Sequence, residues 1–163
     1  MSEIEGFVFC FLNIYAPNRG TERESFFTLL SNELKNTHHD QLIVGGDFNC
    51  TLDFYIDRTS GEPHPQSSRS LSNVIIHHDL IDAWRIKHPQ TRQYTWVRVR
   101  ENQVSAVRLD RFYTSKKLIN RILSADIIPV GFTDHHLVVI NLHTVPSQRF
   151  KPFSHLGAAV AQW

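Results

Sequence analysis

The sequence is short of cysteine and of long apolar runs, and each deficit excludes a class of protein. Its 163 residues include two cysteines, Cys10 and Cys50, too few for a disulfide framework and without the Cys/His spacing of a zinc finger. No apolar stretch approaches the ~20 residues of a membrane-spanning helix, and the acidic start MSEIEG lacks the basic flank of a secretory signal. We therefore expect an intracellular protein, nuclear or cytoplasmic, with no membrane partner.

The net charge is only +1, but the two signs of charge are unevenly distributed along the chain. Residues 1–83 hold 5 Lys and Arg against 12 Asp and Glu, whereas residues 84–121 hold 10 against 2. An acidic region beside a basic one is typical of a metal site flanked by a surface that binds a polyanion. Two solvated faces of different charge would give the same counts, so charge alone leaves both interpretations open.

The spacing of apolar residues predicts interleaved strands and helices, which indicates an α/β class. The clearest helix is predicted over 22–36, because Phe26, Leu30 and Leu34 recur at every fourth position. A second helix is predicted from about 71 to 84, and a hairpin from strands over 94–100 and 105–114. The other predicted elements are a short helix over 115–122 and strands over 7–15, 41–46, 127–130 and 137–142.

Polar residues with catalytic potential gather where the predicted strands stop. A layered sheet fold can bring such strand ends to one rim, where neighbouring carboxylates need a cation to stay ionised. Oxygen ligands favour Mg²⁺ or Mn²⁺ over zinc, and a protonated histidine can stabilise charge on a phosphoryl oxygen. The residues in question are Tyr15, Asn18, Asp47, Asn49, Asp110, Asp134 and His135.

Several of these residues also have purely structural explanations. Asp47 and Asn49 fit an Asx turn at a strand end, and His135 fits a hydrogen-bonded histidine at a sheet edge. Asp110 is harder to explain in this way, because a carboxylate inside an apolar strand must be paired. The same holds for Asp134, which directly precedes the apolar run at 137–140.

Four short motifs in a fixed order resemble one superfamily. They are NIYAPN at 13–18, GGDFN at 45–49, RLDRF at 108–112 and TDHH at 133–136, and the set is similar to the endonuclease/exonuclease/phosphatase superfamily. EPHPQS at 62–67, HPQTRQYTW at 88–96 and RLDRFYTS at 108–115 favour the apurinic-endonuclease-like domain of LINE-type (non-LTR) retrotransposons.

The resemblance covers residues 6–150 and implies an α/β fold. This fold is part of a four-layered α/β sandwich, two β-sheets flanked by helices, in which the N-terminal strands of the family have no counterpart. Residues 151–163 match nothing in the family and are expected to form a poorly ordered tail.

The resemblance also implies a reaction, the hydrolysis of a phosphodiester in double-stranded DNA that leaves a nick with a free 3′-hydroxyl. Matched motif by motif, Asp47 activates the attacking water and Asn49 positions it. Tyr15 contacts the scissile phosphate, His135 stabilises the transition state, and Asp110 orients His135. In this family such a nick primes reverse transcription, so a reverse transcriptase domain in the parent element is an implied partner.

The implied cofactor is Mg²⁺ or Mn²⁺, held by Asp134 and Asp47. The implied DNA-binding groups belong mainly to a hairpin that enters a DNA groove and grips the backbone without reading sequence. They are Asn18, Thr95, Arg98, Arg100 and Arg108.

The sequence departs from the family pattern in ways that bear on activity. The family's N-terminal Asn and metal-binding Glu have no counterpart here, and Val107 stands where the family usually has Ser. We therefore expect weak or absent catalysis from this chain alone. The alternatives are an inactive relic that binds nucleic acid through the basic hairpin and a phosphatase of the same superfamily. A plain interaction domain would leave the DFN, LDR and TDHH triplets unexplained.

Overall fold

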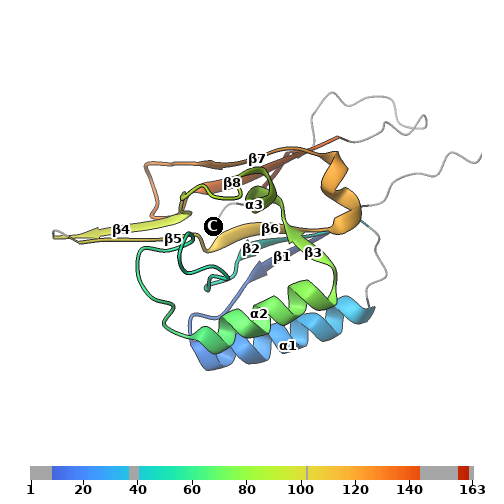
Figure 1. Ribbon diagram of the computed structural model, residues 1–163, viewed down its shortest axis with the longest axis horizontal. Coiled ribbons are helices and arrows are strands. Elements are labelled where there is room, and N and C mark those ends of the chain that lie inside the picture. Colours follow the sequence, from blue (N-terminus) through green and yellow to red (C-terminus); the bar gives the residue numbers. More distant parts are fainter. Residues whose placement is uncertain (1–8, 37–40, 102, 144–157, 162–163) are drawn as a thin grey trace, which may run out of the picture.

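Two β-sheets and a helix pair form the layers of the computed structural model, which describes residues 9–36, 41–101, 103–143 and 158–161 (Figure 1). A four-stranded sheet has the order β1 (Cys10–Tyr15), β2 (Leu42–Asp47), β6 (Asp110–Ser115) and β3 (Leu80–Asp82). A second sheet contains β7 (Ile122–Ile128), β8 (Leu137–Leu142) and β9 (Ala158–Ala161). A separate hairpin pairs β4 (Trp96–Arg100) with β5 (Gln103–Val107). The helices are α1 (Gly20–Asn36), α2 (Pro65–His77) and α3 (Ala83–Lys87), with a 3₁₀ helix η1 (Lys116–Arg121).

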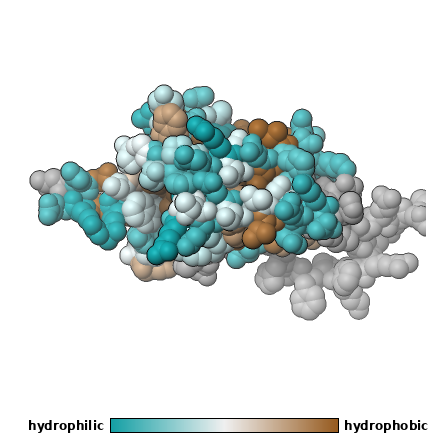
Figure 2. All heavy atoms as spheres, turned by 90° about the horizontal axis from the view of Figure 1, so that it is seen from below, coloured by the Kyte–Doolittle hydropathy of each residue, from teal (hydrophilic) through white to brown (hydrophobic). Residues whose placement is uncertain are grey.

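The layers are plain in Figure 1, where α1 and α2 lie side by side on one face of the four-stranded sheet and β7 and β8 lie on the other. The outer surface of the helix layer is mainly hydrophilic (Figure 2). The β4–β5 hairpin projects from the body of the molecule. No helix in the described part of the chain is long and apolar enough to cross a membrane.

The central strand β2 contributes to both hydrophobic cores. Successive side chains of a strand point to opposite faces of its sheet, and all six residues of β2 are buried. Leu42 and Val44 belong to the core on the helix side, together with Phe27 of α1. Ile43 belongs to the core between the sheets, together with Trp84 of α3. The end of β2 is therefore fixed from both sides.

The two glycines at the end of β2 are required by close packing. A Cβ atom on Gly45 would lie 2.4 Å from Cε1 of Phe112. Gly46 has a φ of +141°, and a Cβ there would lie 1.9 Å from the carbonyl oxygen of Ile14 on the neighbouring strand. The glycines let the three strands approach one another directly before Asp47.

A buried network of ion pairs connects the long loop after β2 to α3 and to the start of β6. Nε and Nη2 of Arg108 donate to the two carboxylate oxygens of Asp57 at 2.8 and 3.0 Å. Nη2 also lies 2.7 Å from Oδ2 of Asp82. Arg85 pairs with Asp57, and Arg111 donates to the carbonyl of Cys50 at 2.9 Å. These contacts hold four segments that are distant in sequence in one arrangement.

Most of the predicted elements are confirmed. The strand predicted over 137–142 matches β8, and the helix predicted over 22–36 begins two residues earlier, at Gly20. Arg23 explains this early start, because its buried guanidinium donates to the carbonyls of Pro17 and Asn18 at 3.0 and 2.9 Å. The predictions for residues 7–8 and 144–150, and most of the predicted tail, lie outside the described residues. Within the tail, β9 pairs antiparallel with β8.

Two predicted elements are wrong. The helix predicted over 71–84 is α2, which ends at His77, followed by β3 and the short helix α3. Asp79, with a φ of +49°, separates α2 from β3, and Asp82 starts a new helix by accepting a hydrogen bond from the backbone N–H of Arg85 at 3.0 Å. The strand predicted over 105–114 is two strands in different sheets, because Arg108 and Leu109 turn the chain from β5 into β6.

We predict that Gly46→Ala destabilises the fold by about 2–4 kcal/mol, because an alanine would combine a strained φ with a backbone collision. Urea denaturation of both proteins measures this. Gly61→Ala is the matched control, since a Cβ at Gly61 has no heavy atom within 4 Å. Equal stability of the two variants would contradict the prediction.

The Asp57 carboxylate is predicted to make the protein acid-sensitive. Burial raises the pKa of this group, but the hydrogen bonds and charges of the surrounding arginines outweigh burial and lower the pKa below its ordinary value of 3.8. The unfolded chain therefore binds the proton more tightly, so the stabilisation is complete well above pH 3.8 and is lost as the pH falls below it.

Asp57→Asn tests this, because it leaves the guanidinium of Arg108 buried without its carboxylate. We expect a loss of about 3 kcal/mol at neutral pH and a shallower decline in acid. Urea denaturation over a series of pH values measures both effects. Asp126→Asn, at an exposed carboxylate of β7, should leave the dependence of unfolding free energy on pH unchanged. If Asp57→Asn lowered the unfolding free energy by the same amount at every pH, the prediction would be contradicted.

Candidate functional site

Two carboxylates and a histidine from three segments converge at one end of the four-stranded sheet. Asp47 ends β2 and Asp110 begins β6, and the two are direct cross-strand partners. His135 precedes β8, and its Nδ1 lies 3.0 Å from Oδ2 of Asp110. One ligand atom from each of the three residues lies within 4.8 Å of the others. The sequence prediction that these residues meet is confirmed.

The electrostatics of this cluster favour a positive partner for the carboxylates. Burial, and then the charge of Asp110, raise the pKa of Asp47 from 3.8 to about 6. The hydrogen bond to Asp110, and the charges of Asp110 and Asp47, raise the pKa of His135 against the opposing effect of burial. Like charges directly opposite each other in a sheet are destabilising, so a positive partner beside the two aspartates would stabilise them.

A divalent cation fits the groups that are present. In the described part of the chain, Oδ1 of Asp110 is buried and has no hydrogen-bond partner. An unpartnered carboxylate oxygen is costly to bury, and here it belongs to the cluster that also contains Asp47 and His135. The oxygen atoms of the two carboxylates are ligands that suit Mg²⁺ or Mn²⁺, and His135 is hydrogen-bonded to one of these carboxylates.

Asn49 is held beside Asp47 by a tight turn. Its backbone N–H donates to Oδ1 of Asp47 at 2.8 Å, and its side-chain N–H donates to the carbonyl of Ala16 at 2.7 Å. Asn49 has a φ of +51°, a conformation that Asn tolerates better than most residues. The Asx turn considered from the sequence is therefore present, and it serves to fix the Asn49 amide at the site.

These residues line an open hollow of about 410 Å³, which we call the acidic hollow. Tyr15, 58 % exposed at the end of β1, and Asn18 lie on one wall, as predicted from NIYAPN. Trp96 lies on another wall and was not singled out from the sequence, although an aromatic residue at the base of a basic hairpin was the available signal. The complete lining is Tyr15, Asn18, Asp47, Asn49, Arg58, Pro63, Trp96, Val107, Leu109 and His135.

Thr95 holds the site together and cannot contact DNA as predicted, because it is fully buried. Its hydroxyl accepts the backbone N–H groups of Leu109 and Asp110, both at 2.9 Å. Its carbonyl accepts the backbone N–H of His136 at 2.6 Å. Thr95 thus joins the backbone that carries Asp110 to the backbone that carries His135.

One other predicted role, that of Arg108, is corrected, and the metal-binding role of Asp134 stays a prediction. Arg108 is 2 % exposed and is committed to Asp57 and Asp82, so it is unavailable to DNA. Asp134 lies outside the Asp47–Asp110–His135 cluster. Its exposed carboxylate accepts a hydrogen bond from the indole N–H of Trp96 at 2.9 Å, which places it at the rim of the hollow.

The remaining predicted DNA contacts, Arg98 and Arg100, are exposed on β4 of the hairpin. Trp96 forms an isolated β-bridge with His135, and the N–H of Val97 donates to the carbonyl of Asp134 at 3.0 Å. The hairpin therefore begins at the site itself and carries its two arginines outward from there. Their contact with DNA stays a prediction.

Removing the Thr95 hydroxyl should destabilise both the fold and the site. Thr95→Val leaves the N–H groups of Leu109 and Asp110 buried without an acceptor, so we expect a loss of about 1–3 kcal/mol. Urea denaturation measures the loss, and Thr95→Ser, which keeps the hydroxyl, should retain most of the stability. Equal stability of the Val and Ser variants would contradict this role for the hydroxyl.

The chain is similar to one transposon protein and to several solved nucleases. It is 41 % identical over 137 residues to a 149 kDa protein of transposon TX1 from Xenopus laevis, covering 83 % of this chain and 10 % of that protein. The chain therefore spans about a tenth of this relative. No family model matches the sequence.

Three solved structures have a similar fold. An AP endonuclease from Archaeoglobus fulgidus matches with a TM-score of 0.72 and 18 % identity, over 82 % of this chain and 61 % of that one. The 3′-5′ exonuclease NExo from Neisseria meningitidis matches with a TM-score of 0.67 and 19 % identity, over 81 % of this chain and 60 % of that one. The Xenopus laevis APE2 catalytic domain matches with a TM-score of 0.65 and 20 % identity, over 79 % of this chain and 48 % of that one. The chain therefore has the fold of an AP endonuclease and is homologous to a segment of a transposon-encoded protein.

Proposed function

We propose that this chain is the endonuclease domain of a transposon protein and that it nicks double-stranded DNA with the help of Mg²⁺ or Mn²⁺. The observation that carries the proposal is the meeting of Asp47, Asp110 and His135 at the acidic hollow, which Asp47 and His135 line together with Asn49 and Tyr15. Asp47 and Asp110 are two buried carboxylates placed opposite each other on neighbouring strands, an arrangement that is unfavourable in itself. Hydrolysis of a phosphodiester with a bound cation would explain it.

Each side chain at the site has its own role in the proposed reaction. Asp47 accepts a proton from the attacking water, which Asn49 orients toward phosphorus. The bond from phosphorus to the 3′ oxygen breaks, the 3′ oxygen takes up a proton, and the products are a 3′-hydroxyl and a 5′-phosphate. Asp110 can only accept when ionised, so Nδ1–H of His135 donates to it and Nε2 is left to stabilise the phosphoryl oxygens.

A cation held by Asp47 and Asp110 would neutralise charge on the phosphate and lower the pKa of the attacking water. Among the described residues the cluster offers two carboxylates, and the affinity of such a site rises with the number of its charged ligands. We therefore propose that catalysis by this chain alone is weak and needs more Mg²⁺ than a site with a third carboxylate.

The proposed partners follow from the surfaces around the site. Tyr15 and Asn18 would contact the scissile strand, and Arg98 and Arg100 would grip the DNA backbone through the projecting hairpin. We propose a reverse transcriptase domain as a further partner in the parent element, because a nick with a 3′-hydroxyl can prime synthesis. We propose an intracellular location, in the nucleus or the cytoplasm, because the proposed substrate is DNA.

Relaxation of supercoiled plasmid tests the function. We expect nicking with Mg²⁺ or Mn²⁺, none with EDTA, and a loss of about 10²-fold or more with Asp47→Asn, since that change removes the group that accepts a proton. Extension of the nicks by a DNA polymerase without prior phosphatase treatment would confirm the 3′-hydroxyl. Asp126→Asn is the matched control and should nick as the unchanged protein does.

The same assay separates the alternatives. Nicking that persists in EDTA or in Asp47→Asn would refute the proposed site. Salt-sensitive DNA binding without any nicking would identify the inactive relic. Release of phosphate from a 3′-phosphorylated end, without nicking, would identify a phosphatase.

A further inference from the structure

Two neighbouring aromatic side chains are displayed on the surface beside the acidic hollow. Phe54 is 48 % exposed and Tyr55 is 71 % exposed. Their ring centroids lie 4.2 Å apart, with an angle of 36° between the planes. Two aromatic rings exposed side by side can serve as a stacking surface for a planar group. Neither ring has a role in the proposed chemistry.

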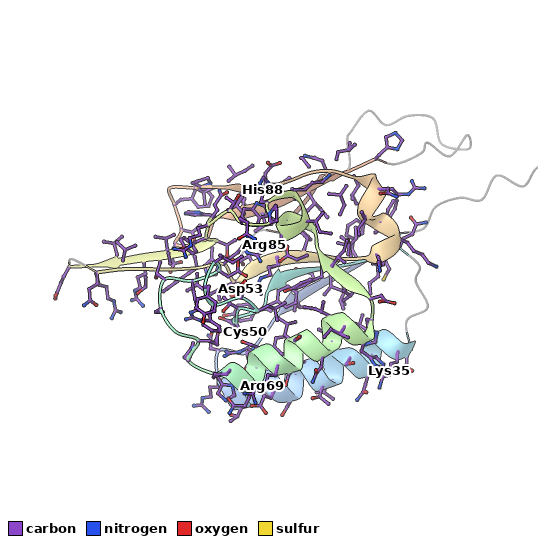
Figure 3. The ribbon with its side chains drawn as sticks, viewed as in Figure 1. Lys35, Cys50, Asp53, Arg69, Arg85 and His88 are labelled. Atoms are coloured by element: carbon purple, nitrogen blue, oxygen red, sulfur yellow. The ribbon has the colours of Figure 1, made fainter. Side chains whose placement is uncertain are left out.

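The turn that carries these rings is firmly held. Oδ1 of Asp53 accepts the backbone N–H groups of Tyr55 and Ile56 at 2.9 and 3.3 Å. The N–H of Asp57 donates to the carbonyl of Asp53 at 2.9 Å, and Asp57 is the centre of the buried ion pairs. Figure 3 shows Asp53 on the loop after β2, between Cys50 and Arg85. The rings are therefore presented in a fixed place at little entropic cost.

The rings form one side of a second open hollow of about 420 Å³, which we call the aromatic hollow. Arg92 and Tyr94 also line this hollow, and Arg58 belongs to the lining of both hollows, so the two adjoin. Arg92 is exposed. Arg58 is fixed by an ion pair with Glu62 at 2.6 Å. Aromatic faces beside an exposed arginine form a surface that suits nucleobases and phosphate.

We propose that the aromatic hollow binds one unpaired nucleotide of the DNA whose scissile phosphate occupies the acidic hollow. This inference rests on the proposed function and extends it to the form of the substrate. A fully paired duplex offers no free base face, because each base is covered by its neighbours, whereas an unpaired nucleotide can stack on Phe54 or Tyr55 while its phosphate meets Arg92. The polar wall at 59–61 argues against an apolar peptide.

Binding in EDTA tests the subsite without requiring catalysis. We use two duplexes that differ only in one unpaired 2-aminopurine near the cleavage position, and we measure anisotropy and 2-aminopurine fluorescence. The unchanged protein should bind the unpaired form more tightly and quench its fluorescence. The double variant Phe54→Ala/Tyr55→Ala should lose about tenfold in affinity for that form, and the quenching, with no change for the paired duplex.

Three further variants sharpen the test. Phe54→Trp/Tyr55→Trp keeps the aromatic faces and should restore both signals. Leu29→Ala/Ile76→Ala, at residues 63 % and 72 % exposed on the helix layer, is the matched control and should bind as the unchanged protein does. Arg92→Ala should reduce the salt dependence of binding by about one ion, with the quenching retained.

The outcomes separate this inference from the proposed function. Loss of the preference for the unpaired form in Phe54→Ala/Tyr55→Ala supports the subsite even if the chain does not nick. The subsite is refuted if this variant binds both duplexes as the unchanged protein does, or weakens both equally, even if nicking is normal. Thermal unfolding of each variant shows whether a loss reflects misfolding.

Discussion

The bidentate contact between Arg108 and Asp57 is the interaction on which the other features depend. It fixes the loop after β2 against the point where β5 turns into β6. Strand β6 begins with Asp110, two residues after Arg108. Asp82 adds the start of α3 to the same group of charges. The acidic hollow and the aromatic hollow therefore depend on the same buried ion pairs, although Arg85, Arg108 and Arg111 line neither hollow. Buried pairs of this kind are costly to break.

The sequence was sufficient to locate the cluster because its members sit at strand ends. A run such as LIVGG can hardly be anything other than a buried strand, and a polar triplet directly after it must lie at the rim of the sheet. Asp110 was informative for another reason, since a carboxylate in an apolar segment needs a partner, and the structure supplies His135. The resemblance to nucleases rests on the order of these short motifs, and the shared fold agrees with it.

The roles of Thr95 and Arg108 could not be predicted, because whether a side chain faces the interior or the solvent depends on where the chain passes from one sheet to another. The alternating pattern of 94–114 was interpreted as one hairpin, and in that arrangement both side chains would face outward. Thr95 instead lies directly before β4 and Arg108 directly after β5, so both are at the base of the hairpin, where Thr95 accepts two N–H groups and Arg108 pairs with carboxylates. Periodicity alone does not reveal such a turn.

The hairpin is a two-stranded sheet of its own, attached to the body near Thr95 and Val107. Among the described residues, those beyond its first two pairs, Trp96–Val107 and Val97–Ala106, make no hydrogen bond to the segments that carry Asp47, Asp110 or His135. Substitutions in the outer part of the hairpin would therefore leave the acidic hollow intact. A surface that can vary while the acidic hollow stays the same would let related elements differ in what they bind.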